Sequence, residues 1–206
     1  MLNQLIKTSL LLTAIFSLGN CGFTGNSGDK ETVNSSPATA TPKVVKPYEL
    51  FQPKAAEFSK LPAKVQLTSQ PYIKGKAVYY LQRITLKDKS EKKPTGWIYN
   101  EFSSFPLAII AKTPEEVETV ILEKCDEISL GSYARGNLGG KSETIPAYGW
   151  KCEIAVVDKT IPAVIYRKTF QNKLEELKLI SGSGKEDRAA PPSNEIGEFL
   201  KSLPQK

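Results

Sequence analysis

The chain contains no histidine among its 206 residues. Without an imidazole, Ser-His-Asp triads, Cys-His dyads and every metal site that uses histidine are excluded. Carboxylates, hydroxyls, lysines and cysteines remain as the groups from which a catalytic or metal site would have to be built. We expect neither a cofactor nor a metal ion.

Long hydrophobic runs are also missing. The most apolar stretch covers residues 10–18, which is well short of the ~20 residues that a membrane-spanning helix needs. It follows Lys7 and is closed by the small and polar residues Gly19 and Asn20, as in the three parts of a secretory signal. The pattern therefore predicts a removable signal peptide over residues 1–21.

The end of this signal, Leu18-Gly19-Asn20-Cys21, resembles the lipobox of bacterial lipoproteins. Asn20 departs from the Gly, Ala or Ser that usually precedes the cysteine. The resemblance implies that Cys21 becomes the N-terminus and carries acyl chains, and two or three chains hold a protein firmly to a membrane. The domain would then face away from the cytoplasm in a bacterial envelope. Gly22, where enterobacterial inner-membrane lipoproteins often have Asp, favours the outer membrane. The alternative is an ordinary secretory signal with an incidental cysteine.

Cysteines are scarce, with three in the whole chain. If Cys21 takes the lipid, Cys125 and Cys152 remain as an even pair. An even pair in an oxidising compartment predicts a disulfide. The alternative is two buried free thiols.

The segment 22–48 has too few apolar residues to bury a core and is rich in Gly, Ser, Thr, Asn and Pro. We predict a disordered tether there, followed by one globular domain over residues 49–206. The formal net charge is +6, with lysines scattered among carboxylates. Such a balance suits an anionic lipid surface as well as nucleic acid, and an exported, tethered chain is not expected to meet nucleic acid.

In the first half of the domain, the sequence pattern favours helix in some segments and strand in others. We expect a short helix over 54–61, a strand over 72–86 rich in β-forming residues, and a charged loop over 87–96. Thr113-Pro114-Glu115-Glu116 has the pattern of a capping box with proline at the first helical position. Residues 119–130 fit either a helix or a strand, and we favour one or two helical turns followed by a strand.

The second half is clearer. After a glycine-rich loop over 135–146, residues 148–156 alternate as a strand, with five residues on the core face: Tyr148, Trp150, Cys152, Ile154 and Val156. A turn at 158–160 predicts a hairpin with the strand 163–170. We expect a helix over 173–180 and a loop over 181–192.

A final helix, capped by Ser193 or Asn194 and ended by Pro204, has an apolar face at helical spacing. That face consists of Ile196, Phe199, Leu200 and Leu203. The predicted fold is α+β: a single domain with a small, mainly antiparallel sheet, one short internal helix and a C-terminal helix packed on the sheet.

This layout resembles a domain that recurs in uncharacterised bacterial proteins, cyanobacterial ones among them. The similarity includes Lys74-Gly75-Lys76 before the first strand, the segment 113–117 and the helix over 192–204. It covers most of residues 71–204. It implies the fold described above and brings no known activity.

Two glycine-rich segments resemble phosphate-binding or catalytic motifs. Residues 136–142 have three residues between the first glycine and Gly-Lys-Ser, where a P-loop needs four. Pro146 also ends any helix that would follow, so a hairpin loop is favoured. The Gly182–Lys185 segment fails the same pattern. A Ser-Lys pair from Ser181, Ser183 and Lys185 is chemically possible, but this loop does not preorganise it.

Two further groups deserve a chemical interpretation. An acidic run is a conceivable calcium or acid–base site, although a solvated helix start explains its first members: Glu115, Glu116, Glu118, Glu123, Asp126 and Glu127. Trp97, Tyr99 and Phe102 are either core residues or the lining of a ligand groove.

These observations favour a non-enzymatic envelope lipoprotein whose tethered domain binds an envelope protein or a cell-wall or lipid component. A flexible arm would raise the local concentration of the domain near its partner. The alternative is an envelope hydrolase or wall-modifying enzyme that uses carboxylates or a Ser-Lys pair. Paired carboxylates with shifted pKa values in a cleft would favour the enzyme.

Overall fold

The computed structural model describes residues 45–101, 107–136, 142–177 and 185–206. Residues 43–206 form a compact unit of their own. The predicted signal, most of the predicted linker, Phe102, the middle of the 136–142 motif and the serines of the Ser-Lys segment lie outside the described residues. Among the residues that are described, no helix combines the length and apolarity needed to cross a membrane.

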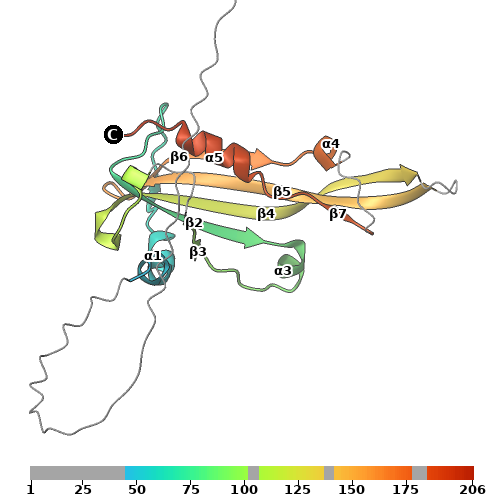
Figure 1. The fold of residues 1–206 in the computed structure, drawn as a ribbon, viewed down its shortest axis with the longest axis horizontal. Coiled ribbons are helices and arrows are strands. Elements are labelled where there is room, and N and C mark those ends of the chain that lie inside the picture. Colours follow the sequence, from blue (N-terminus) through green and yellow to red (C-terminus); the bar gives the residue numbers. More distant parts are fainter. Residues whose placement is uncertain (1–44, 102–106, 137–141, 178–184) are drawn as a thin grey trace, which may run out of the picture. The chain divides into compact units, whose positions relative to one another are not determined.

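A seven-stranded sheet forms the centre of the domain (Figure 1). Its strands, in order across the sheet, are β1 (Lys64–Val65), β6 (Ala163–Gln171), β5 (Ser142–Asp158), β4 (Val117–Gly136), β2 (Lys76–Ile84) and β3 (Ile98–Tyr99), with β7 (Asp187–Arg188) paired to β5. The predicted α+β class and single domain with helices on a sheet are confirmed. The sheet is larger than predicted and is mixed, because β1–β6, β2–β4 and β5–β7 are parallel pairs. The long connection from β2 to β4 permits this, since a parallel pair needs a crossover.

The two longest strands, β4 and β5, form one antiparallel hairpin from Thr119↔Asp158 to Gly136↔Ser142. The ambiguous residues 119–130 are therefore strand throughout, as their β-branched start favours. The one or two helical turns expected directly before this strand are a single 3-10 turn, η3 (Pro114–Glu116). The predicted capping box is wrong: Thr113 makes no side-chain cap, and Glu116 Oε2 instead accepts a hydrogen bond from the Lys112 N–H at 3.0 Å. The predicted loop over 135–146 is also too long, because β5 begins at residue 142.

Both faces of the sheet are covered, by different helices (Figure 1). One face packs against α5 (Ser193–Lys201), and we call it the α5 face. The other packs against α1 (Pro47–Phe51), η1 (Gln52–Lys54) and α2 (Ala55–Phe58), and we call it the α2 face. Buried residues of β4 alternate between the two faces, with Ile121 and Cys125 on the first and Val120 and Leu122 on the second. A strand buried on both sides reads as a continuous apolar run, which is why its sequence did not separate strand from helix.

The C-terminal helix docks as predicted. Ile196, Phe199, Leu200 and Leu203 are all buried, and the Phe199 ring lies 5.7 Å from both Tyr166 and Phe170 on β6. The predicted cap is wrong, however. Pro192 occupies the N-cap without a side-chain hydrogen bond, and Ser193 is the first helical residue.

The remaining elements are short. The helix predicted over 54–61 is η1 followed by α2, and the strand predicted over 72–86 is β2. The loop predicted over 87–96 begins with a helix, α3 (Leu86–Ser90), which Thr85 and Asp88 close with a capping box. The described part of the helix predicted over 173–180 is α4 (Leu174–Leu177), and η2 spans Leu107–Ile109. The prediction of one short internal helix is therefore wrong, because α1 to α4 all precede α5.

Candidate functional site

A groove opens on the α2 face just beyond the end of α2, with a volume of about 180 Å³. Its floor is apolar and comes from three adjacent strands, with Leu122 on β4, Ala155 on β5 and Val164 on β6. The remaining lining residues are Ser59, Pro62, Trp97, Lys124, Glu153 and Arg167. Ser59 and Pro62, which follow α2 in the chain, line the groove on the side of that helix.

The walls of the groove carry more positive than negative charge. Arg167 Nη1 donates a hydrogen bond to Glu153 Oε1 at 2.9 Å, and both side chains are about half exposed, so the pair adds little stability. Lys124 lies across from Glu153 in the strand register. Within the described ranges, no carboxylate lies within ion-pair distance of Lys124. A lysine ammonium and a guanidinium therefore face the groove with one carboxylate between them.

Trp97 is held at the groove by the side chain of Gln52. The Gln52 Nε2 donates to the Trp97 carbonyl at 3.1 Å, and its Oε1 accepts from the Tyr99 N–H at 2.7 Å. Of the aromatic residues considered for a groove, Trp97 lines it. Tyr99 is buried instead and stacks on Phe51, with 5.1 Å between the ring centroids.

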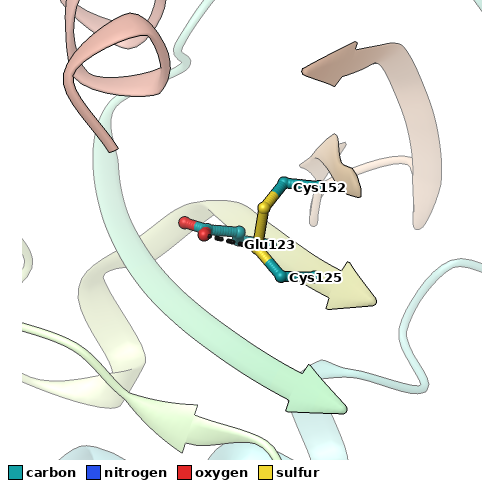
Figure 2. A group of neighbouring side chains, drawn as sticks. All are labelled: Glu123, Cys125 and Cys152. Atoms are coloured by element: carbon teal, nitrogen blue, oxygen red, sulfur yellow. Dashed lines mark hydrogen bonds between the residues drawn. A yellow bond between two sulfur atoms is a disulfide. The ribbon is translucent and has the colours of Figure 1, made fainter. Parts of the chain in front are cut away.

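A second group of chemically interesting residues lies on the α5 face. Cys125 and Cys152 are directly opposite each other in the β4–β5 register and form a disulfide, and the Glu123 carboxyl points at it (Figure 2). In the described part of the chain, these three residues are the one group with ligand atoms close enough for a metal ion. With the sulfurs bonded to each other, the group lacks the thiolates that cysteine ligation requires, and we assign no metal to it.

Glu123 is an unusual neighbour for a disulfide. Its side chain is buried, with 3% of the residue exposed, and its Oε1 lies 2.9 Å from Cys125 Sγ. Burial raises the pKa of the Glu123 carboxyl to about 7, because a buried charge without a partner is unfavourable. A disulfide sulfur carries no hydrogen, so this contact is a hydrogen bond only in the form in which Glu123 is protonated and donates to sulfur.

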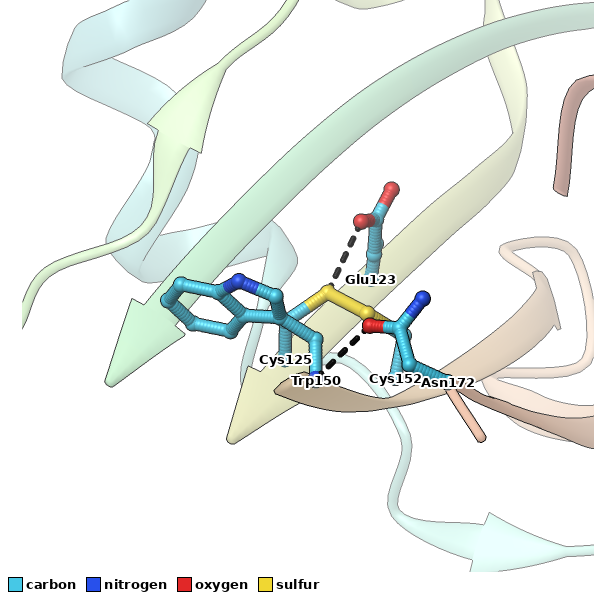
Figure 3. The surroundings of a disulfide bond; sticks show 5 residues. All are labelled: Glu123, Cys125, Trp150, Cys152 and Asn172. Carbon is cyan, nitrogen blue, oxygen red and sulfur yellow. Dashed lines mark hydrogen bonds between the residues drawn. A yellow bond between two sulfur atoms is a disulfide. The ribbon is translucent and has the colours of Figure 1, made fainter. Parts of the chain in front are cut away.

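Asn172, directly after the end of β6, makes two hydrogen bonds to Trp150 on β5 beside the disulfide (Figure 3). Its Oδ1 accepts from the Trp150 N–H at 2.8 Å, and its own N–H donates to the Trp150 carbonyl at 3.0 Å. A Cβ at Gly149 would lie 2.7 Å from Leu130 Cδ1 and 2.9 Å from Asn172 Cβ. Glycine at this position thus allows Asn172 to close the end of β6 over β5.

The acidic run does not form one site. Glu123 and Glu127 are buried on the α5 face, whereas Asp126 points to the opposite face and pairs with Lys89 at 2.9 Å. Glu127 accepts from the Leu86 N–H at 2.9 Å and from Arg188. The other members lie at or beside η3. Strand structure separates these carboxylates, because successive side chains point to opposite faces.

Sequence reasoning missed Lys124, Glu153 and Arg167 as groove residues. Each belongs to a different strand, and they meet only through the β4–β5–β6 register. Leu122 and Lys124 are two residues apart on β4, and Glu153 and Ala155 are two residues apart on β5. This spacing indicates that the two residues of each pair share a face of the sheet. It does not show where the helical cover of that face ends.

No family model matches the chain, and neither a curated protein nor a solved structure matches it.

Proposed function

We propose that the protein is an envelope lipoprotein, held by acyl chains on Cys21 at a bacterial membrane, with the outer membrane favoured, and with its domain outside the cytoplasm. Two independent features support this. The lipobox-like segment ends on Cys21, and the other two cysteines are joined in a buried disulfide. Disulfides of this structural kind persist in oxidising compartments. As part of the same proposal, we infer that the domain is related to the uncharacterised bacterial domain that its sequence resembles.

The domain acts by binding, and the groove on the α2 face is its site. The observation that carries this is the meeting of three side chains around an apolar floor: the indole of Trp97, the guanidinium of Arg167, and Lys124, which has no ion-pair partner among the described residues. An indole offers a flat apolar face to the ring of a sugar, and cations favour an acidic substituent on that sugar. The volume of about 180 Å³ is small beside the ~300–1,000 Å³ of pockets for drug-sized ligands. We assign the groove to one acidic sugar unit of a cell-wall polymer.

The alternative enzymatic function has less support. Hydrolysis of a glycosidic bond by two carboxylates needs both to flank the bond. In the described ranges, Glu153 is the one carboxylate that lines the groove, and it is engaged by Arg167. Glu123, whose pKa is raised, lies on the opposite face of the sheet. These positions favour a binding site.

The groove makes a direct prediction about cell-wall binding. Trp97→Ala and Lys124→Glu are each expected to weaken binding of the purified full-length chain to isolated cell walls about tenfold, which corresponds to ~1.4 kcal/mol. Co-sedimentation at increasing cell-wall concentration measures the change. Lys151→Glu is the matched control, because Lys151 is exposed on the same face of β5 but does not line the groove.

Equal binding by Trp97→Ala, Lys124→Glu and wild type would refute the groove assignment. Loss of binding in Lys151→Glu to the same degree would show that general surface charge, rather than the groove, holds the polymer. Binding to vesicles of phosphatidylglycerol with the same variant pattern would redirect the assignment to anionic lipid.

A further inference from the structure

The two edges of the sheet differ in how much of their backbone is free. At the β3 edge, the side chain of Gln52 bonds to the Trp97 carbonyl and to the Tyr99 N–H, so these backbone groups are already engaged. At the other edge lies β1, where residues 63–67 are all exposed. Unpaired backbone groups on an edge strand can pair with another chain, and natural sheets usually protect them. The β1 edge is therefore the place where this sheet can be extended.

The chain at β1 pairs with β6 through alternate residues. The N–H groups of Gln66 and Thr68 donate to carbonyls of β6 at 2.8 Å and 2.9 Å. Backbone groups of successive residues in a strand point to opposite sides, so Val65 and Leu67 direct their N–H and C=O groups away from β6. Within the described ranges, neither of these two N–H groups donates a hydrogen bond. Two donors and two acceptors thus form a row along an open edge.

The same two residues also expose large apolar side chains. Val65 is 58% exposed and Leu67 is 61% exposed. They share one face of the strand because they are two residues apart. Val65 is paired with Val164 of the α2 face, so both side chains belong to that face. A single exposed apolar residue is ordinary on a protein surface, but here apolar side chains and unpaired backbone groups occur together on one edge strand.

We propose that the protein forms a twofold dimer in which β1 pairs with β1 of a second copy, antiparallel and centred on Gln66. In this register Val65 lies opposite the partner's Leu67, and Leu67 lies opposite the partner's Val65. Each pair exchanges two hydrogen bonds, because the N–H and C=O groups of these residues point outward. Lys64 lies opposite the partner's Thr68, so the register places no like charges against each other. An edge that complements itself in this way fits the isologous contact of a twofold dimer.

The dimer joins the two sheets into one continuous sheet. Residues directly opposite each other in a sheet point to the same face, so the twofold axis sets both α2 faces, and both grooves, on the same side. A polymer that spans the two grooves is held by two contacts, and the second contact gains from the effective concentration that the first provides. This last consequence rests on the proposed function, whereas the dimer itself does not depend on the groove or its ligand.

Cross-linking of cysteine variants of the full-length chain in membranes tests the register. The two Gln66 residues form a non-hydrogen-bonded pair, with about 4.5 Å between their Cα atoms, which a disulfide can span. Gln66→Cys is therefore expected to give a disulfide-linked dimer under mild oxidation. Lys64→Cys is the matched control, because it is exposed on the same face of the strand but does not lie opposite itself. It should cross-link about tenfold more slowly. Wild type, as the control for Cys21, should give no linked dimer.

Sedimentation equilibrium in density-matched detergent measures the association of the full-length chain without a cross-link. The molar mass of wild type should rise with concentration from that of a monomer toward that of a dimer. Val65→Glu/Leu67→Glu should stay monomeric, because like charges then face each other across the twofold axis. Ile98→Glu is the matched control, since Ile98 is an apolar residue, 49% exposed, on the opposite edge strand β3. It should associate as wild type does.

A wild type that is monomeric at every concentration, or equal linkage of Gln66→Cys and Lys64→Cys, would overturn the proposal. Association that persists in Val65→Glu/Leu67→Glu would overturn it as well, because another surface would then hold the copies together. Linkage of Gln66→Cys to a different protein in place of a second copy would also overturn it, and would assign the β1 edge to an extended segment of that protein.

Discussion

Replacing Glu123 with glutamine is expected to raise the free energy of unfolding at pH 8 by about 3 kcal/mol. The folded domain holds the Glu123 carboxyl in a buried position that raises its pKa from 4.5 to about 7. Each unit of pKa difference between folded and unfolded chain is worth about 1.4 kcal/mol. Glutamine keeps the size and polarity of the neutral acid without a charge to bury.

The same change should remove a pH dependence. Below about pH 4.5 Glu123 is neutral in both the folded and the unfolded chain, so its burial costs no ionisation. Between about pH 4.5 and pH 7 the unfolded chain loses this proton first, so wild-type stability falls as pH rises, and above pH 7 this contribution is constant. Denaturant unfolding from pH 4 to pH 9 should show this fall in wild type and its absence in Glu123→Gln.

Glu127→Gln is the matched control, because Glu127 is buried on the same face of β4. Its carboxylate is bonded to Arg188 and to the Leu86 N–H, so its removal should lower stability at pH 8. Opposite signs for the two variants are the expected outcome. A destabilised Glu123→Gln at pH 8 would mean that Glu123 has a favourable partner when ionised.

Removing the disulfide is expected to lower the free energy of unfolding by about 3–4 kcal/mol in the double variant Cys125→Ala/Cys152→Ala. The bond closes a loop with a sequence separation of 27 residues, and in the chain-entropy model such a cross-link restricts the unfolded chain by roughly that amount. For a domain of this size, the midpoint of thermal unfolding should fall by about 10 °C. Calorimetry and denaturant titration measure both quantities.

Wild type with its disulfide reduced serves as the comparison for the double variant, because it has the same open chain without the lost sulfur atoms. Its stability should lie between that of the oxidised wild type and that of the double variant. A loss below about 1 kcal/mol in both open forms would show that the β4–β5 hairpin is held by packing alone.

The parts of the fold that were predictable are those with a local period. The strand around residues 148–156 alternates every second residue, and the final helix repeats Ile196, Phe199 and Leu200 at helical spacing. Both periods correspond to one buried face in the structure. The disulfide followed from counting cysteines rather than from any pattern around them.

The parts that were not predictable depend on contacts between distant segments. The parallel pairing of β2 with β4 requires that the chain between them cross over, and no residue in either strand signals it. The groove brings together Trp97, Lys124 and Arg167, which come from three separate segments of the chain. In the sequence, Glu123 is one of several acidic residues in a row. Nothing in the strand itself shows that this carboxylate is buried, because its burial depends on the neighbouring strands and the covering helix.

The measurement that tests the anchored, oxidised state most directly is the intact mass of the protein extracted from membranes, taken with and without reductant and a thiol-alkylating reagent. We predict a chain that begins at Cys21, carries a diacylglyceryl or triacylglyceryl mass, and takes up the alkylating reagent at two thiols only after reduction. Cys21→Ala, as the control, should be released from membranes and keep its disulfide. An unlipidated chain cut at another position, or three thiols that react without reductant, would contradict this account.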